Sequence, residues 1–218
     1  MRALFLHGLV GAPEAWSEVL AELDVEAIAV AMPGHGTPVQ ASWAANLDAI
    51  DTQGATLAIG YSFGARVALG LLAERRVARA ILIGVNPGIS DEARPARRAA
   101  DARWAQLLRE RGIEAFVETW EVQPLFATQG RVAPEKLAAR RALRLTLDPE
   151  QLARCLETMG LAEMPDYREV RGAQLIVGAD DAKFVALARG LATMIPEAGH
   201  DVLLEQPVAL AAAIHDLM

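Results

Sequence analysis

The chain has 218 residues, of which 53% are hydrophobic, and a formal net charge of −7 at neutral pH. This length suits a single globular core, and the acidic excess argues against binding to nucleic acid or to an anionic membrane surface. No apolar run reaches the ~18 residues of a membrane-spanning helix, and the N-terminus lacks the basic region and cleavage site of a signal peptide. The single cysteine, Cys155, cannot form an internal disulfide. We therefore expect a protein of the reducing cytoplasm.

Apolar stretches predict the first two strands at residues 2–7 and 25–31, with a helix at 13–23 between them. Each strand runs into a glycine-containing loop with a histidine, His7 after the first and His35 after the second. We expect His7 to fix its loop by hydrogen bonds and His35 to be a turn residue, and neither to act as a catalytic base.

The next apolar stretch, residues 55–59, predicts a buried strand that ends at Gly60, and a helical pattern follows shortly after. Between them, Ser62 lies in the motif G-x-S-x-G, which is typical of the strand-to-helix nucleophile elbow of α/β-hydrolases. A turn this tight brings backbone segments close together, so a Cβ at position 60 or 64 would collide. The alternative is a tight structural turn in which the serine has no catalytic role.

Two backbone amides are predicted to form an oxyanion hole beside Ser62. The Phe63 amide would lie at a helix N-terminus, where it can stabilise developing negative charge. In this fold a strand that ends in His-Gly supplies the second amide from the loop after it. Because the first strand ends in His7-Gly8, that donor should be the Leu9 N–H.

A fourth strand is predicted at 78–85, and strands resume at 173–178. The residues between them predict helices, as the i, i+3, i+4, i+7 spacing of apolar residues shows at Ile113, Phe116, Val117 and Trp120. The predicted fold class is therefore α/β: a core of residues 1–85 and 166–218, mostly parallel sheet with flanking helices, and a helical lid of residues 86–165. Such a lid would lie above the carboxyl ends of the strands, where ligands bind in α/β sheets.

The strand that ends this insertion is followed by Asp180 and Asp181, and a short last strand at 192–196 is followed by His200. The order Ser62, Asp181, His200 is the chain order of the α/β-hydrolase triad. Since each residue follows a strand, all three should meet at one edge of the sheet. His200 would take the Ser62 proton, and Asp181 would hold the imidazole in the required tautomer.

The sequence resembles the 2-succinyl-6-hydroxy-2,4-cyclohexadiene-1-carboxylate synthases, which are lyases of menaquinone biosynthesis with the α/β-hydrolase fold. The resemblance spans nearly the whole chain, and its most specific parts are Arg66 after the elbow and the segment Trp120…Gln123-Pro124-Leu125-Phe126-Ala127. Further matching motifs are Leu6-His7-Gly8, Pro33-Gly34-His35-Gly36, Gly60 to Arg66, Asn86-Pro87-Gly88, Asp101-Ala102-Arg103-Trp104, Asp181-Ala182-Lys183-Phe184, Ala198-Gly199-His200 and Glu205-Gln206-Pro207.

The resemblance implies an elimination that releases pyruvate from a small, multiply carboxylated cyclohexene substrate, with no metal and no cofactor. We find no cluster of metal ligands and no dinucleotide-binding loop in the sequence. By motif, the residues that contact the substrate in this family are Tyr61, Arg66, Trp120, Arg97 and Arg144. For the last two, Arg94, Arg98 and Arg141 are close enough in sequence to be alternatives.

Two other functions stay open at this stage, a carboxylesterase that uses Ser62 as a nucleophile and a non-catalytic binding protein. The chain also departs from its relatives, with Ala65 in place of a second elbow glycine, Ala31 where an acid often precedes the Pro-Gly turn, and no N-terminal hairpin before residue 2. We expect a monomer or a small homo-oligomer.

Overall fold

The computed structural model describes residues 2–218, which form a six-stranded parallel sheet in the order β2-β1-β3-β4-β5-β6. The predicted α/β fold class is confirmed, and a strand lies at each of the six predicted places. The strands are β1 (Arg2–Leu6), β2 (Glu26–Val30), β3 (Leu57–Tyr61), β4 (Arg79–Ile83), β5 (Ala173–Gly178) and β6 (Ala192–Ile195).

Two predicted boundaries were wrong. The strand expected at 55–59 extends past Gly60, because its ladder with β4 continues through the pairs Gly60–Leu82 and Tyr61–Ile83. The helix expected at 13–23 divides into a 3₁₀ turn η1 (Pro13–Trp16) and a short α1 (Ser17–Leu20), after which the chain forms turns.

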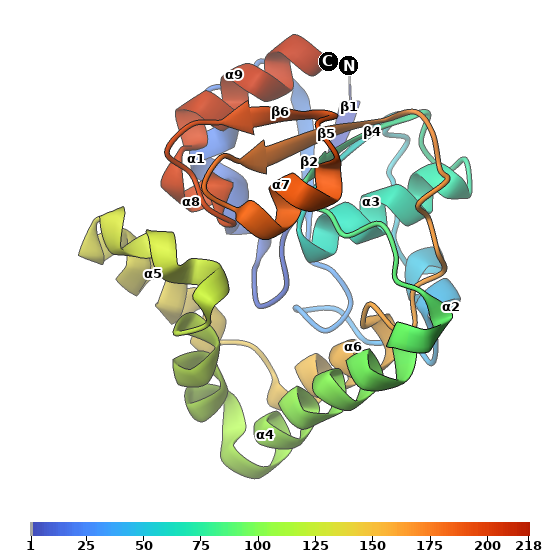
Figure 1. The fold of residues 1–218 in the computed structure, drawn as a ribbon, viewed down its shortest axis with the longest axis vertical. Coiled ribbons are helices and arrows are strands. Elements are labelled where there is room, and N and C mark those ends of the chain that lie inside the picture. Colours follow the sequence, from blue (N-terminus) through green and yellow to red (C-terminus); the bar gives the residue numbers. More distant parts are fainter. Residues whose placement is uncertain (1) are drawn as a thin grey trace.

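Helices cover both faces of the sheet (Figure 1). On one face lie α2 (Trp43–Asp48) and α3 (Phe63–Ala73), and on the other lie η1, α1 and α9 (Pro207–Leu217). Because side chains alternate along a strand, β1 sends Leu4 and Leu6 to the first face and Ala3 and Phe5 to the second. Burial on both faces explains why the strands are continuously apolar in sequence. Two short helices, α7 (Ala182–Ala188) and α8 (Val202–Glu205), follow β5 and β6.

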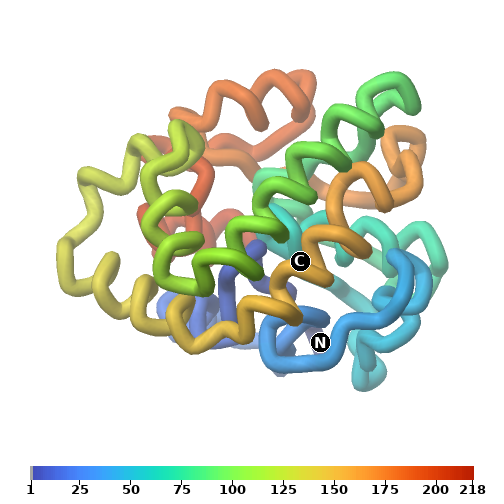
Figure 2. The backbone as a smooth tube through the Cα atoms, turned by 90° about the horizontal axis from the view of Figure 1, so that it is seen from below, coloured from blue at the N-terminus to red at the C-terminus, as the bar shows by residue number. Residues whose placement is uncertain are grey.

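The segment between β4 and β5, here called the β4–β5 segment, is helical and lies beyond the carboxyl ends of the strands (Figure 1). Its elements are η2 (Asp91–Ala93), α4 (Arg94–Glu121), η3 (Pro124–Arg131), α5 (Pro134–Leu145) and α6 (Pro149–Met159). Figure 2 shows α4 and α6 running side by side in front of the sheet, and a cluster of apolar residues that includes Leu108, Phe116 and Leu152 joins them. Gly112, with φ of 73°, kinks α4. None of the helices within residues 2–218 is long and apolar enough to cross a membrane.

The loops after β1 and β2 are held together by two buried histidines. The Nδ1–H of His7 donates to the carbonyl of Gly8 at 2.8 Å, and its Nε2 accepts from the Met32 amide at 3.4 Å. The Nε2 of His35 accepts from the Val10 amide at 3.0 Å, so its remaining proton lies on Nδ1, 3.1 Å from the Pro33 carbonyl. His7 has the loop-fixing role expected from the sequence, and His35, expected only as a turn residue, also joins the two loops through Val10.

Both histidines are neutral in the folded protein. Burial lowers the pKa of His7 to about 4 and that of His35 to about 3, and the backbone carbonyl that each ring faces opposes the shift only in part. In the unfolded chain each pKa returns to roughly 6.5. The unfolded state therefore binds more protons below that pH, and the stability contributed by the neutral rings is lost as the pH falls from 6.5 toward the folded values.

We predict that the free energy of unfolding falls by about 2.5 kcal/mol between pH 7.0 and pH 5.5 through these two residues, or about 1.3 kcal/mol for each. Urea unfolding of wild type and His35→Gln at both pH values measures this, and the variant should lose about half of the pH dependence. His215→Gln, which changes an exposed histidine on α9, is the matched control and should behave as wild type. Equal pH dependence in all three proteins would contradict the prediction.

Candidate active site

Ser62 lies at a sharp turn between β3 and α3, with φ of 52° and ψ of −104°. This backbone conformation is strained for a residue with a side chain, and it occurs where the surrounding structure forces it. The two flanking glycines permit the turn. A Cβ at Gly60 would lie 2.2 Å from the carbonyl oxygen of Gly64, and a Cβ at Gly64 would lie 2.1 Å from that of Leu6. The elbow is therefore pressed against the carboxyl end of β1, which the structure places beside β3.

The structure brings Ser62, His200 and Asp181 into one hydrogen-bonded chain. The Nε2 of His200 lies 2.8 Å from the Ser62 hydroxyl, and its Nδ1 lies 2.7 Å from Oδ2 of Asp181. Because a carboxylate only accepts, Nδ1 carries the proton and Nε2 is free to accept from Ser62. Asp181 also caps α7 by accepting from the Phe184 amide, whereas Asp180 points away and pairs with Arg131 at 2.5 Å.

The His200 ring is enclosed by aromatic side chains. Phe184, Tyr61 and Phe126 lie with their ring centroids 4.4, 5.4 and 6.4 Å from that of His200. His200 and Asp181 are both buried, with 2% and 7% of their surface exposed. This packing holds the imidazole in place between its two hydrogen-bond partners.

The amides of Leu9 and Phe63 both belong to residues that line the cavity next to Ser62. Within residues 2–218, neither amide donates a hydrogen bond to another protein group. Phe63 is the first residue of α3, so its N–H lies at the positive end of the helix. Leu9 is held by its neighbour Val10, which has φ of 58° and donates to His35. The two amides are therefore available to an oxygen atom bound near Ser62.

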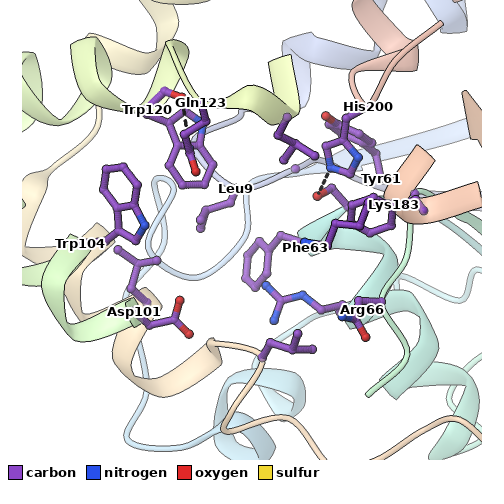
Figure 3. Close-up of a pocket in the computed structure, with 18 of the residues that line it drawn as sticks. Leu9, Tyr61, Phe63, Arg66, Asp101, Trp104, Trp120, Gln123, Lys183 and His200 are labelled. Carbon is purple, nitrogen blue, oxygen red and sulfur yellow. Dashed lines mark hydrogen bonds between the residues drawn. The ribbon is translucent and has the colours of Figure 1, made fainter. Parts of the chain in front are cut away.

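The cavity beside Ser62 has a volume of about 240 Å³ and combines aromatic walls with three cationic side chains. Figure 3 shows Leu9, Phe63, Trp104 and Trp120 around it, with Arg66 and Asp101 on facing sides. Its charged lining residues, apart from His200, are Arg66, Arg97, Lys183 and Asp101. Among the described residues 2–218, no group of three or more His, Cys, Asp or Glu side chains is arranged to hold a metal ion.

Arg66 is fixed in the wall of the cavity. Its Nη1 donates to the carbonyl of Met159 at 3.2 Å, and its guanidinium lies over the Phe63 ring at 5.1 Å from the centroid. Burial, followed by the nearby charge of Arg97, lowers the pKa of Arg66 to about 10, so it remains cationic at neutral pH. Tyr61 also lines the cavity, and burial raises the pKa of its phenol well above the usual value, which keeps the phenol neutral.

The structure separates the arginines that the sequence could not distinguish. Arg97 lines the cavity, whereas Arg144 does not, because its guanidinium pairs with Glu121 at 2.9 Å and lies over Phe126. The alternatives Arg94, Arg98 and Arg141 also lie outside the cavity lining and pair with Asp91, Glu163 and Glu121, respectively.

Among the cavity residues that sequence reasoning did not assign to the site, four are polar or aromatic side chains of particular interest: Lys183, Asp101, Trp104 and Gln123. All four belong to motifs that carry the family resemblance, which was the signal that could have identified them. Lys183 lies two residues after Asp181, at the start of α7, and its Nζ is 5.3 Å from the centroid of the Phe184 ring. It therefore adds a cation on the side of the cavity that holds His200.

Comparisons with known proteins agree with this geometry. The model of the alpha/beta hydrolase family matches residues 3–213. The 2-succinyl-6-hydroxy-2,4-cyclohexadiene-1-carboxylate synthase of Enterobacter sp. (strain 638) is 31% identical over an alignment that covers 99% of this chain and 90% of the relative. The synthase of Citrobacter koseri is also 31% identical, with 99% and 92% covered.

Two solved structures are similar over nearly the whole chain. MenH from S. aureus aligns with a TM-score of 0.90 and 26% identity, covering 99% of this chain and 92% of that one. A thermophilic esterase from Thermogutta terrifontis aligns with a TM-score of 0.81 and 26% identity, covering 100% and 89%. The chain thus belongs to the alpha/beta hydrolase family and, within it, to the group of enzymes that contains the 2-succinyl-6-hydroxy-2,4-cyclohexadiene-1-carboxylate synthases.

Proposed function

We propose that this enzyme is a lyase of menaquinone biosynthesis that eliminates pyruvate from a small, multiply carboxylated cyclohexene substrate. The observation that carries the proposal is that the cavity joins the Ser62–His200–Asp181 chain and the Leu9 and Phe63 amides to the partly buried cation Arg66 and to Arg97. Simple ester substrates offer no charge for these guanidinium groups, whereas carboxylates bind them in a bidentate manner. The two synthases compared above are named for a succinylated cyclohexadiene carboxylate, which is a carboxylated ring compound.

In this proposal the Ser62–His200 pair acts as a base toward carbon. It removes a proton from the carbon next to a substrate carbonyl, and His200 becomes the imidazolium that Asp181 stabilises. The C–H electron pair moves toward the carbonyl oxygen, and the Leu9 and Phe63 amides stabilise the resulting enolate. When the enolate re-forms the carbonyl, a C=C bond forms and the C–O bond to the enolpyruvyl group breaks. The departing enolate takes up the proton and becomes pyruvate.

We propose Ser62, His200 and Asp181 as the catalytic residues and Tyr61, Arg66, Arg97 and Trp120 as substrate contacts. Arg144 would need to leave Glu121 to join them. The division into a core and a lid of residues 86–165 is part of the same proposal, and it is supported by the α4 residues Arg97 and Trp120 in the cavity wall. We propose a cytoplasmic location, with Cys155 as a buried free thiol whose pKa burial raises to about 12.

A carboxylesterase is the second candidate, because the Thermogutta terrifontis esterase is as similar in sequence as MenH from S. aureus. It would use Ser62 as a nucleophile that forms an acyl-enzyme. Incubation with the menaquinone precursor and with a neutral p-nitrophenyl ester separates the two functions. We expect rapid pyruvate release and weak ester cleavage, whereas rapid ester cleavage without pyruvate release would favour the esterase.

One prediction from the proposed function concerns the Ser62–His200–Asp181 chain. Ser62→Ala, His200→Ala and Asp181→Asn should each lower turnover on the order of 10³-fold or more, because each removes a part of one proton-transfer unit. Asp180→Asn is the matched control, since its carboxylate pairs with Arg131 and does not reach His200. Steady-state pyruvate release measures all four variants, and equal losses at positions 180 and 181 would refute the assignment.

Another prediction concerns the partly buried cation Arg66. Arg66→Ala should cost about 2–4 kcal/mol in kcat/KM for the anionic substrate, because it leaves a substrate carboxylate without its partner in a desolvated cavity. Hydrolysis of the neutral ester should fall far less. Arg98→Ala, which removes an arginine that pairs with Glu163 outside the cavity, is the control and should change neither reaction much. Equal loss of both reactions in Arg66→Ala would instead indicate damage to the elbow.

A further inference from the structure

Asp101 is a carboxylate in the wall of a cavity that we propose to bind carboxylates. It lies on α4, has only 4% of its surface exposed, and faces the Arg66 guanidinium (Figure 3). A buried anion at this place reduces the positive charge available to an anionic substrate. Since the charge of Asp101 opposes the binding of an anion, we looked for a structural role of this carboxylate that favours binding.

The contacts of Asp101 show what that role is. Among the described residues 2–218, its two carboxylate oxygens accept only from Arg97, and both accept from the same atom, Nε, at 3.0 Å for Oδ1 and 2.8 Å for Oδ2. Within residues 2–218, the terminal nitrogens Nη1 and Nη2 of Arg97 donate no hydrogen bond. The ion pair thus uses the inner nitrogen of the guanidinium and leaves the outer pair, the fork that matches a carboxylate, without a protein partner.

Asp101 is held in a fixed position for this task. It lies one helical turn after Arg97, so α4 sets their separation. On its other side Gly160 approaches closely, and a Cβ at that position would lie 2.6 Å from Oδ2. Arg66 needs no such partner, because the Met159 carbonyl and the Phe63 ring already orient it. Arg97 is also partly exposed, with 36% of its side chain accessible, and would otherwise sample many rotamers.

We propose that Asp101 is a positioning residue that holds the guanidinium of Arg97 so that its free fork faces the cavity and receives a substrate carboxylate. This inference deepens the proposed function and depends on its carboxylate-binding part. The charge of Asp101 and its orienting contact have opposite effects on anion binding. If charge dominated, removing the carboxylate would strengthen binding, and if orientation dominates, the same change weakens binding.

Succinate serves as the probe, and tryptophan fluorescence follows its binding because Trp104 and Trp120 line the cavity. The midpoint of the titration gives Kd, and its amplitude reports the folded fraction, so a partly unfolded variant remains interpretable. The proteins are wild type, D101N, D101E, R97A and the double variant R97A/D101N. E163Q is the matched control, because it removes the carboxylate partner of the neighbouring Arg98 outside the cavity.

We expect D101N to weaken succinate binding by about tenfold although it makes the cavity more positive, and to have no further effect in the R97A background. D101E should keep most of the affinity, and E163Q should match wild type. Tighter or unchanged binding by D101N, or equal weakening with and without Arg97, would overturn the proposal. Failure of wild type to bind succinate would overturn it together with the carboxylate-binding role of the cavity. Succinate binding in the expected pattern without pyruvate release would overturn only the lyase reaction.

Discussion

The close contact between Gly64 and the Leu6 carbonyl is the constraint on which the site depends. It presses the start of α3 against the end of β1, and a side chain at position 64 would prevent it. As a result, the Phe63 amide from one segment and the Leu9 amide from another line the same cavity beside Ser62. Parallel pairing of β1, β3, β4 and β5 then brings the loops that follow all these strands to one edge of the sheet. The close contact at the elbow and the parallel strand pairing thus bring together groups that are far apart in sequence.

The cavity is built around partly buried positive charge, and removing charge from water is costly unless it is compensated. Arg66 is compensated by the Met159 carbonyl, the face of Phe63 and the nearby carboxylate of Asp101. Aromatic and aliphatic side chains supply much of the rest of the wall. Such surroundings strengthen each interaction between a guanidinium and an incoming carboxylate, since the effective dielectric constant is lower than in water. The same packing holds the His200 ring between Ser62 and Asp181.

The β4–β5 segment is joined to the catalytic loops by polar contacts as well as by apolar packing. Arg140 of α5 pairs with the buried Asp201 at 3.0 Å, directly after His200. Thr128 of η3 donates to Glu205, whose other oxygen accepts from the Gly199 amide, directly before His200. The loop that carries His200 is therefore braced on both sides by residues of this segment and of α8. The position and orientation of His200 therefore depend on the β4–β5 segment as well as on the sheet.

Local sequence by itself determined the six strands, the elbow and the order of Ser62, Asp181 and His200, because short apolar runs and small residues at a tight turn have direct steric causes. The two loop histidines were also predictable, since His7 directly follows β1 and His35 lies in the Pro-Gly turn after β2. Only the tertiary structure decided where β3 ends, because that depends on its partner β4. It also decided that Arg66 and Arg97 line the cavity while Arg144 does not. The direction of a long cationic side chain depends on which distant carboxylate meets it, as Glu121 meets Arg144, and no local pattern encodes that contact.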